Sequence, residues 1–296
     1  MRFRSGPAVV TVPATSANLG PGFDSLGLAL ELRDELEASV TASGLGVDVT
    51  GEGAGEVARD ETHLVVRAMR ACFDVVGAQP GGLLLSCRNR IPHARGLGSS
   101  AAAIVGGIFL ARTLVDDGLQ LMDDHAAFQL AAELEGHPDN VAAAVYGGLT
   151  VAGLSARTFY ATRVPVALEV RAEVFVPPTA VSTELARGLL PELVSHRQAA
   201  ANAGRAALLV AGLAGQPELL LTATADLLHQ QYRRPAMPDS LDLVDRLRAD
   251  GHAAVVSGAG PSVLVLGTDD GDLSPYTPPG WGHQRLAVAN EGARAL

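Results

Sequence analysis

A segment rich in glycine and serine separates two apolar runs near the end of the first third of the chain. It reads Pro92-His93-Ala94-Arg95-Gly96-Leu97-Gly98-Ser99-Ser100-Ala101-Ala102. A strand-like run precedes it, and the apolar run that follows is typical of a buried helix. Glycines lack a Cβ and would let the backbone approach a ligand closely, while the serines would cap the helix. The start of a helix favours an anion, so this segment predicts a phosphate-binding loop. The alternative is an ordinary loop that caps a helix.

This segment differs from the two best-known nucleotide loops. No Gly-Lys-Ser/Thr follows the glycines, as a P-loop would require, and the spacing is not that of the Gly-x-Gly-x-x-Gly dinucleotide fingerprint. The type of phosphate ligand must therefore be inferred from other parts of the chain.

A second informative stretch lies near the N-terminus, where residues 12–24 read VPATSANLGPGFD. A strand-like run ends there in small residues, and a Gly-Pro-Gly turn precedes Asp24. Such a tight loop would direct the Asn18 amide and the Asp24 carboxylate at a small polar ligand. In the alternative reading, Asn18 forms an Asx-turn and Asp24 caps a strand.

A third glycine-rich stretch, VSGAGPSV, occupies residues 256–263 between two strand-like runs. Taken by itself it predicts a hairpin turn. Its small residues would also allow its backbone to lie close to the first glycine loop or to a substrate.

Length and charge limit the classes of function. A chain of 296 residues predicts about two domains. A net charge of −10 argues against a general nucleic-acid binder, which needs a basic face. No run approaches the ~18 uninterrupted apolar residues of a membrane span, and the basic N-terminus leads into a strand-like run instead of a cleavable signal. We expect a cytoplasmic protein, with Cys72 and Cys87 buried and reduced.

The hydrophobic spacing predicts a mixed α/β chain. Apolar residues recur at helical spacing over residues 63–77, and the helix after the glycine loop contains Gly106 and Gly107, which predict close packing of another element. Further helices are expected at residues 123–135, 139–146, 183–190, 196–213, 217–228 and 241–250. Strands are expected at residues 8–12, 26–32, 37–41, 47–50, 83–87, 147–151, 158–164, 168–176, 253–256, 263–266 and 286–289.

Together, the three glycine-rich stretches resemble the GHMP small-molecule kinases. The loop fits Pro-x-x-x-Gly-Leu-Gly-Ser-Ser-Ala, and residues 256–263 resemble the closing Gly-x-Gly-x-Ser motif. The N-terminal stretch matches the first motif of the homoserine-kinase subfamily, Pro-Ala-Thr-Ser-Ala-Asn-Leu-Gly-x-Gly-Phe-Asp. Four more segments keep the register of that subfamily: residues 135–142 (EGHPDNVA), Thr183 with Arg187 and Pro191, His196 with Asn202 and Arg205, and His229 with Tyr232 and Arg233. The resemblance extends from Val10 to Leu266.

This resemblance implies a fold and an activity. The fold would be the α+β, two-domain GHMP kinase fold, with a ribosomal-protein-S5-like α/β half at residues 1–165 and a ferredoxin-like α/β half at residues 166–296. The activity would be ATP-dependent phosphorylation of L-homoserine to O-phospho-L-homoserine in threonine biosynthesis. It would proceed by direct γ-phosphoryl transfer assisted by Mg²⁺, which needs positioning and charge neutralisation more than covalent help. The resemblance also implies a homodimer and no nucleic-acid or membrane partner.

The resemblance assigns roles residue by residue. Residues Pro92 to Ala102 would bind ATP, and Ser100 with Glu135 would hold the metal, with Ser99 and Glu133 as the alternatives. The homoserine ligands would be Asn18, Asp24, His137, Asp139, Arg187, Arg233 and Gly260. The catalytic residues would be Asp139, Asn140 and Ser100. Asp139 is assigned first to substrate binding, and whether it also acts as a base stays open.

Two rival functions remain at this stage. Another GHMP kinase, acting on mevalonate, a sugar or a diphosphocytidyl intermediate, would lack the Asn18–Asp24 loop and the two arginines, and this chain has both. A non-catalytic binding protein of the same fold would have lost the metal or phosphate residues. Ser99, Ser100 and the acidic pair Glu133 and Glu135 are all present.

Overall fold

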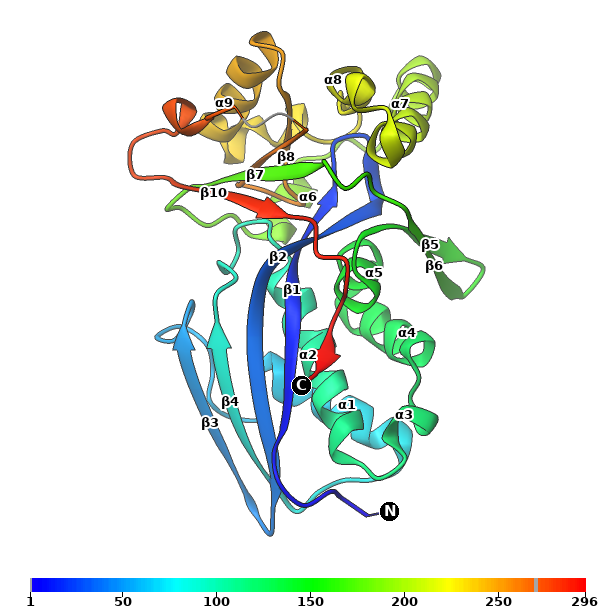
Figure 1. Cartoon of the computed structure of the whole chain (residues 1–296), viewed down its shortest axis with the longest axis vertical. Coiled ribbons are helices and arrows are strands. Elements are labelled where there is room, and N and C mark those ends of the chain that lie inside the picture. The colour runs from blue at the N-terminus through cyan, green and yellow to red at the C-terminus, as the bar shows by residue number, and fades with distance from the viewer. Residues whose placement is uncertain (1, 269–270) are drawn as a thin grey trace.

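The structure, a computed structural model, describes residues 2–268 and 271–296. Its two β-sheets and their helices stack along the long axis of the molecule (Figure 1). The strands are β1 (Ala8–Asn18), β2 (Gly22–Thr41), β3 (Gly44–Gly51), β4 (Gly82–Asn89), β5 (Leu149–Ser155), β6 (Thr158–Val164), β7 (Arg171–Val176), β8 (Ala253–Val256), β9 (Val263–Gly267), β10 (Gly282–Ala287) and β11 (Arg294–Ala295). The helices are α1 (Leu64–Val76), α2 (Ser99–Leu114), α3 (Gly118–Leu121), α4 (Asp124–Glu135), α5 (Asp139–Tyr146), α6 (Thr183–Gly188), α7 (His196–Gly215), α8 (Leu220–Ala223) and α9 (Pro238–Ala249), with 3₁₀ turns η1 (Pro217–Leu219), η2 (Gln231–Ala236) and η3 (Ser274–Tyr276).

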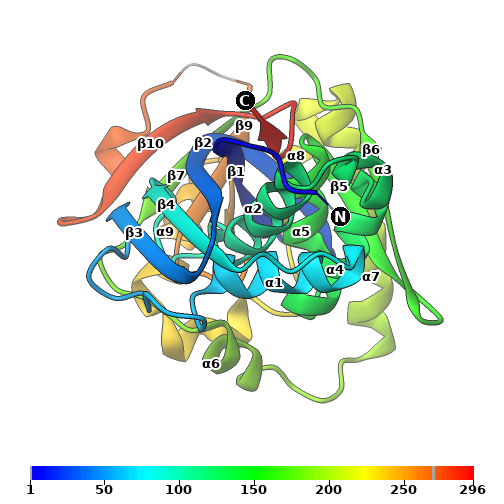
Figure 2. The same ribbon diagram turned by 90° about the horizontal axis from the view of Figure 1, so that it is seen from below.

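The first sheet has the order β11-β1-β2-β4-β3, with β5 and β6 attached to β2. Helices α1, α2, α4 and α5 lie on one side of it (Figures 1 and 2). The two strands expected at residues 26–32 and 37–41 are parts of one long strand, β2, which pairs with β1 along almost its whole length. The hairpin between β1 and β2 reaches up to the second domain, and this carries the N-terminal motif to the boundary between the sheets.

Helix α2 lies close to its neighbours because of its two glycines. A Cβ at Gly106 would lie 3.0 Å from Val12 Cγ2, and a Cβ at Gly107 would lie 2.8 Å from Ala68 Cβ. The predicted close packing at this pair is confirmed: the sheet and α1 occupy the space that larger side chains would need.

The second sheet has the order β10-β7-β9-β8. Numbered by their order in the chain, the four strands lie in the order fourth, first, third and second, and each neighbouring pair is antiparallel. This is the strand order of a ferredoxin-like half. The helix expected at residues 217–228 is wrong, since only η1 and α8 form and the helix stops at Ala223. The Asp226 carboxylate accepts hydrogen bonds from the N–H groups of Leu228, His229 and Gln230. This short acidic side chain competes with the helix for the backbone donors.

The C-terminal end of the chain returns to the first sheet. The N–H of Ala289 donates to the carbonyl of Ala29 at 2.9 Å, and β11 pairs with β1. The division into residues 1–165 and 166–296 stays a prediction, and residues 288–296 pack with the strands of the first sheet.

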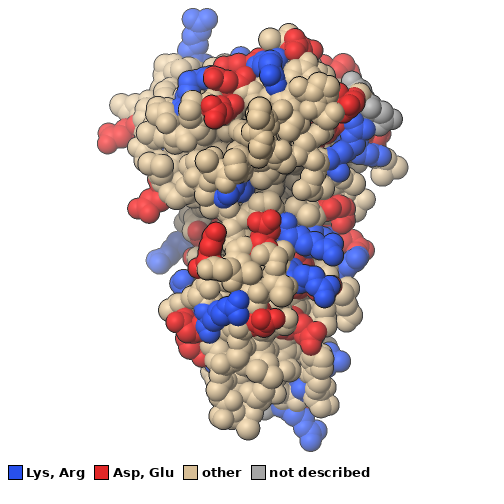
Figure 3. Space-filling model, turned by 90° about the vertical axis from the view of Figure 1, so that its left-hand side faces the viewer, with Lys and Arg blue, Asp and Glu red and all other residues tan. Residues whose placement is uncertain are grey.

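The charged side chains are mixed on the face that Figure 3 shows, where arginines lie next to aspartates and glutamates. Among the described residues, no helix combines the length and the apolar composition that a membrane crossing requires. Cys72 and Cys87 are buried free thiols, and burial raises the pKa of each to about 12, so both stay protonated.

Candidate functional site

The three glycine-rich stretches meet where the two domains join. The Asn18 side chain donates to the carbonyl of Gly258 at 2.8 Å, and the Gly258 N–H donates to the carbonyl of Ala17 at 3.1 Å. The Ser257 hydroxyl donates to the carbonyl of Gly96 at 2.6 Å. Segments about 160 and 240 positions apart in the sequence therefore form one hydrogen-bonded unit, as the third stretch led us to expect.

The two glycines of the loop allow close packing inside the protein. Gly96 and Gly98 have φ of +75° and +71°, a conformation that favours glycine. A Cβ at Gly96 would lie 2.9 Å from the Gly260 carbonyl oxygen, and one at Gly98 would collide with the Thr15 side chain. At both positions a Cβ would point at protein atoms, so the glycines let the three motifs pack against one another.

We expect the substitution Gly98→Val to destabilise the fold by about 3 kcal/mol or more, because it adds a collision with Thr15 to a strained φ. The matched control is Gly77→Val, since Gly77 has the same φ of +71° with nothing within 4 Å of its Cβ position. Urea unfolding of both variants measures the difference. An equal loss of stability in the two variants would show that the packing against Thr15 contributes nothing.

Helix α2 begins without a side-chain cap. Its N-cap is Gly98, whereas Ser99 and Ser100 are the first helical residues, so the expected serine cap is wrong. The first N–H groups of the helix therefore remain available to an anion. The Ser100 hydroxyl instead donates to Glu135 Oε1 at 2.6 Å.

In front of this helix end lies a cavity of about 230 Å³, which we call the arginine cavity. Its walls combine backbone of the glycine stretches with polar side chains from both domains: Ala17, Asn18, Ala94, Gly96, Gly98, Ser99, Ser100, Glu135, His137, Asp139, Asn140, Thr183, Arg187, Arg233, Gly258 and Ala259. Most of the predicted site residues are thus brought together. Gly258 and Ala259 line the cavity in place of Gly260, which packs against Met237.

One wall of the arginine cavity is acidic. Burial raises the pKa of Glu135, although the hydrogen bond from Ser100 opposes this effect. Glu133, the alternative metal ligand, is exposed at the surface of α4. No cluster of three or more histidine, cysteine or acidic side chains suited to a metal occurs in the described part of the chain. A cation here would use Ser100, Glu135 and oxygens of a ligand.

Asp139 opens helix α5 beside this acidic wall and is only 2% exposed. Its Oδ1 accepts from the Asn140 N–H at 2.8 Å and lies 3.3 Å from His137 Nδ1. This contact with the carboxylate raises the pKa of His137. The Asn140 side chain is turned toward β1, where its Oδ1 accepts from the Thr15 hydroxyl.

Two arginines form the opposite wall. Arg187 makes a two-pronged ion pair with Asp24, at 3.0 and 2.6 Å. The Asn18 Oδ1 accepts from the Asp24 N–H at 3.0 Å. This hydrogen bond spans six residues of sequence, whereas that of an Asx-turn spans about two. Arg233 is only 1% exposed, and burial lowers its pKa to about 10, so it remains charged at neutral pH. Among residues 2–268 and 271–296 no carboxylate pairs with Arg233, which favours an anionic ligand there.

A second cavity, of about 310 Å³, lies on the other side of Ser99 and Ser100, and we call it the histidine cavity. Its walls include His63, Asn89 and His93. His63 is 6% exposed and its Nδ1 has no hydrogen-bond partner in the described structure. Burial lowers the pKa of His63, so the imidazole is neutral. Because Ser99 and Ser100 line both cavities, a single elongated ligand could span them.

Several residues support the glycine loop without lining the arginine cavity. Leu97, Ala101 and Ala102 are buried in the core. The Arg95 side chain turns away and donates to the carbonyls of Pro177 and Pro178. Sequence reasoning did not single out Asp34, whose carboxylate accepts from the N–H groups of Arg90 and Ile91 and fixes the start of the loop. No motif surrounds Asp34 in the sequence, so no local signal could have identified it.

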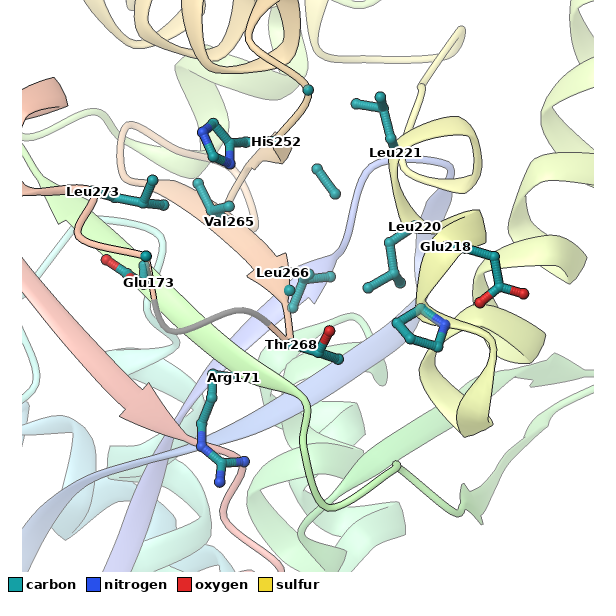
Figure 4. A pocket seen from close by; sticks show the side chains of 15 residues that line it. Arg171, Glu173, Glu218, Leu220, Leu221, His252, Val265, Leu266, Thr268 and Leu273 are labelled. Carbon is teal, nitrogen blue, oxygen red and sulfur yellow. The ribbon is translucent and has the colours of Figure 1, made fainter.

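A third cavity, of about 300 Å³, lies between the second sheet and α8 (Figure 4). Leu220, Val265 and Leu266 form much of its wall. It has two carboxylates: Glu173 is already bound by His283 and Arg285, and Glu218 lies in the short turn η1. We assign no site to this cavity.

Comparison with known proteins agrees with this geometry. The family model for the N-terminal domain of GHMP kinases matches residues 63–148, and that for the C-terminal domain matches residues 199–274. A homoserine kinase from Streptomyces avermitilis is 53% identical over 99% of this chain and 97% of its own length. The crystal structure of homoserine kinase from Cytophaga hutchinsonii superposes with a TM-score of 0.84 at 26% identity, over all of both chains. A putative homoserine kinase from Listeria monocytogenes gives 0.78 at 30% identity, over 98% of this chain and 99% of its own.

Proposed function

The chain belongs to the homoserine kinases, a branch of the GHMP kinase family, and we propose that it transfers the γ-phosphoryl group of ATP to the side-chain hydroxyl of L-homoserine. The product would be O-phospho-L-homoserine, for threonine synthesis. The observation that carries the proposal is the buried cation Arg233, which shares a cavity with an uncapped helix start and the Ser100–Glu135 pair. The side of the cavity formed by Arg233 suits an amino-acid carboxylate. The side formed by the helix start and the Ser100–Glu135 pair suits a nucleotide triphosphate.

The nucleotide would lie across Ser99 and Ser100. Its phosphates would accept hydrogen bonds from the first N–H groups of α2, a helix of 16 residues. The positive end of the helix dipole would also stabilise their negative charge. Its base would enter the histidine cavity, where the unpartnered Nδ1 of His63 is available to a purine edge.

Ser100 and Glu135 fit a Mg²⁺ ion, which prefers oxygen ligands. The raised pKa of Glu135 also fits, because a bound cation would offset the burial that disfavours the charged carboxylate. When bound, Mg²⁺ would neutralise charge on the triphosphate. Glu135 is preferred to the exposed Glu133 as its ligand.

Homoserine would lie between the arginines and Asp139. Arg233 and Arg187 would bind its carboxylate, while Asp24 and Asp139 would receive its ammonium group. His137, whose raised pKa favours the charged form, would orient the substrate beside Asp139. Asp139 would hold the reacting hydroxyl toward the phosphates, a positioning role sufficient for a loose transition state. Asn18 and Asn140 would fix the walls of the cavity through their hydrogen bonds to Gly258 and Thr15.

We expect Arg187→Leu to raise the KM for homoserine by about tenfold or more, with the KM for ATP within about twofold of the wild-type value. Arg187 is half-buried and charge-assisted hydrogen bonds of this kind contribute about 1.5–3 kcal/mol. Steady-state kinetics in both substrates test this. If both Michaelis constants changed together, Arg187 would not be a carboxylate ligand.

A coupled assay with ATP and Mg²⁺ tests the reaction itself, with homoserine, mevalonate, shikimate and galactose as acceptors. We expect the rate of homoserine phosphorylation to be far above the rates with mevalonate, shikimate and galactose. Preferred turnover of mevalonate or a sugar would assign the chain to another GHMP activity. Binding of homoserine without turnover would leave a binding protein of the same fold.

We also propose that the protein is a cytoplasmic homodimer. ATP is a cytoplasmic substrate, and the two cysteines are free thiols. Leu154 and Tyr160, on the projecting β5–β6 hairpin, are 58% and 51% exposed and support a contact between two copies. Light scattering on the purified protein would give the mass in solution.

A further inference from the structure

The guanidinium of Arg233 is held from one side only. Its Nη1 donates to the carbonyl of Gly258 at 3.0 Å and to His229 Nδ1 at 3.1 Å. In the described structure its Nε has no partner, and no hydrogen bond from Nη2 is found. Nε and Nη2 form one edge of the guanidinium, with two parallel donors, which is the edge that a carboxylate binds in a two-pronged manner. The anchoring of Nη1 therefore leaves the edge formed by Nε and Nη2 without a protein partner in the described structure.

His229 can accept this hydrogen bond in only one protonation state. Its ring is completely buried, and its Nε2 lies 2.7 Å from the carbonyl oxygen of Gly20. A carbonyl can only accept, so Nε2 carries the hydrogen, and Nδ1 is left as the acceptor for Arg233. Desolvation by burial lowers the pKa of His229, in keeping with the neutral ring.

The surroundings of His229 fix the plane of its ring. Phe23 stacks on it with a centroid distance of 5.1 Å, and the guanidinium of Arg233 lies 5.7 Å from the Phe23 ring centre. The Asp226 carboxylate accepts a hydrogen bond from the backbone N–H of His229 at 3.0 Å. The ring is thus locked by the β1–β2 turn and by the segment in which the predicted helix fails.

We propose that His229 is a positioning residue, which aims the unpartnered edge of the Arg233 guanidinium at the carboxylate of the amino-acid substrate. The inference rests on the proposed function, because it takes Arg233 as a ligand of that carboxylate. His229 does not line the arginine cavity and acts only through Arg233.

Two substitutions separate the two hydrogen bonds of the ring. In His229→Asn, the side-chain oxygen occupies the place of Nδ1 and can still accept from Arg233. In His229→Gln, the amide reaches the place of Nε2 and can still donate to Gly20, but the acceptor for Arg233 is lost. We expect His229→Gln to raise the KM for homoserine about tenfold, and His229→Asn to change it by less than about threefold. The KM for ATP should stay the same in both.

The decisive experiment is a double-mutant cycle with Arg233→Met, in which kcat, both KM values and the melting temperature are measured for all variants. If His229 acts through Arg233, His229→Gln adds nothing to the KM for homoserine once Arg233 is absent. An equal effect of His229→Gln in both backgrounds, or equal effects of Gln and Asn in the wild-type background, would overturn the proposal. If Arg233→Met itself left the KM for homoserine unchanged, the proposed function of Arg233 would fail, an outcome distinct from failure at His229. Melting temperatures identify a variant that is merely unstable.

Discussion

Replacing Arg233 by methionine is expected to raise the KM for homoserine about 100-fold and to leave the KM for ATP within about twofold. The substitution removes a fully buried charge that has no carboxylate partner among the described residues. Loss of one partner from a desolvated charge pair costs about 3 kcal/mol, which corresponds to this change. Steady-state kinetics with each substrate varied in turn give both constants.

The stability of this variant provides the control. Methionine fills a similar volume without a charge to desolvate, so Arg233→Met should unfold at the same temperature as the wild type or at a higher one. Arg233→Lys keeps the charge but loses the two-donor edge, so its KM for homoserine should lie between those of the wild type and Arg233→Met. A rise in the KM for ATP as large as that for homoserine would contradict a role in carboxylate binding.

The second large effect is expected for Glu135→Gln, which should lower kcat by about 100-fold and weaken the dependence on Mg²⁺. Glutamine keeps the oxygen that accepts from Ser100 but cannot supply the charge for a cation. Activity measured over a Mg²⁺ titration at saturating ATP and homoserine tests this. An unchanged Mg²⁺ requirement would remove Glu135 from the metal site.

The same substitution should stabilise the protein at neutral pH. Burial raises the pKa of Glu135, so the folded chain binds this proton more tightly than the unfolded chain. Stability therefore falls as the pH rises from the unfolded pKa through the raised folded value, and the full cost is present above it. Glu135→Gln removes that cost, so it should melt at a higher temperature than the wild type near pH 8 and at the same temperature near pH 4. Melting curves at several pH values, without nucleotide or metal, would show whether the difference has this sign.

The local parts of the fold were predictable from the sequence. The apolar spacing of residues 63–77 predicted α1, which buries Val65, Met69, Cys72 and Phe73 on one side. Strand β6 and helix α5 begin and end at the predicted residues. These elements are specified by their own residues, through hydrophobic period and terminal signals.

The parts that failed depend on contacts distant in the sequence or on competition for backbone donors. Strand β11 has only two residues, and its pairing with β1 joins the two ends of the chain. The predicted helix does not continue beyond Ala223, because the Asp226 carboxylate accepts hydrogen bonds from the backbone N–H groups of His229 and Gln230. Asp226 is a single side chain within an otherwise helical pattern.

The same distinction applies to the site. The motifs predicted most of the residues around the arginine cavity, because their residue types carry the chemistry. The direction of a side chain could not be inferred in this way. Gly98 faces Thr15, Arg95 faces Pro177, and the Asn140 side chain bonds to β1. Each of these directions is set by a neighbour from another part of the chain.

Arg233 is the group expected to recognise the amino-acid carboxylate, and a substrate that lacks this carboxylate tests its role most directly. 3-Amino-1-propanol keeps the hydroxyl and ammonium groups of homoserine but has no carboxylate. The measurement is the ratio of kcat/KM for homoserine to kcat/KM for 3-amino-1-propanol, in the wild type and in Arg233→Met. We expect the ratio to fall about 100-fold in the variant, because only homoserine loses an interaction. A ratio that is unchanged by the substitution would contradict the account.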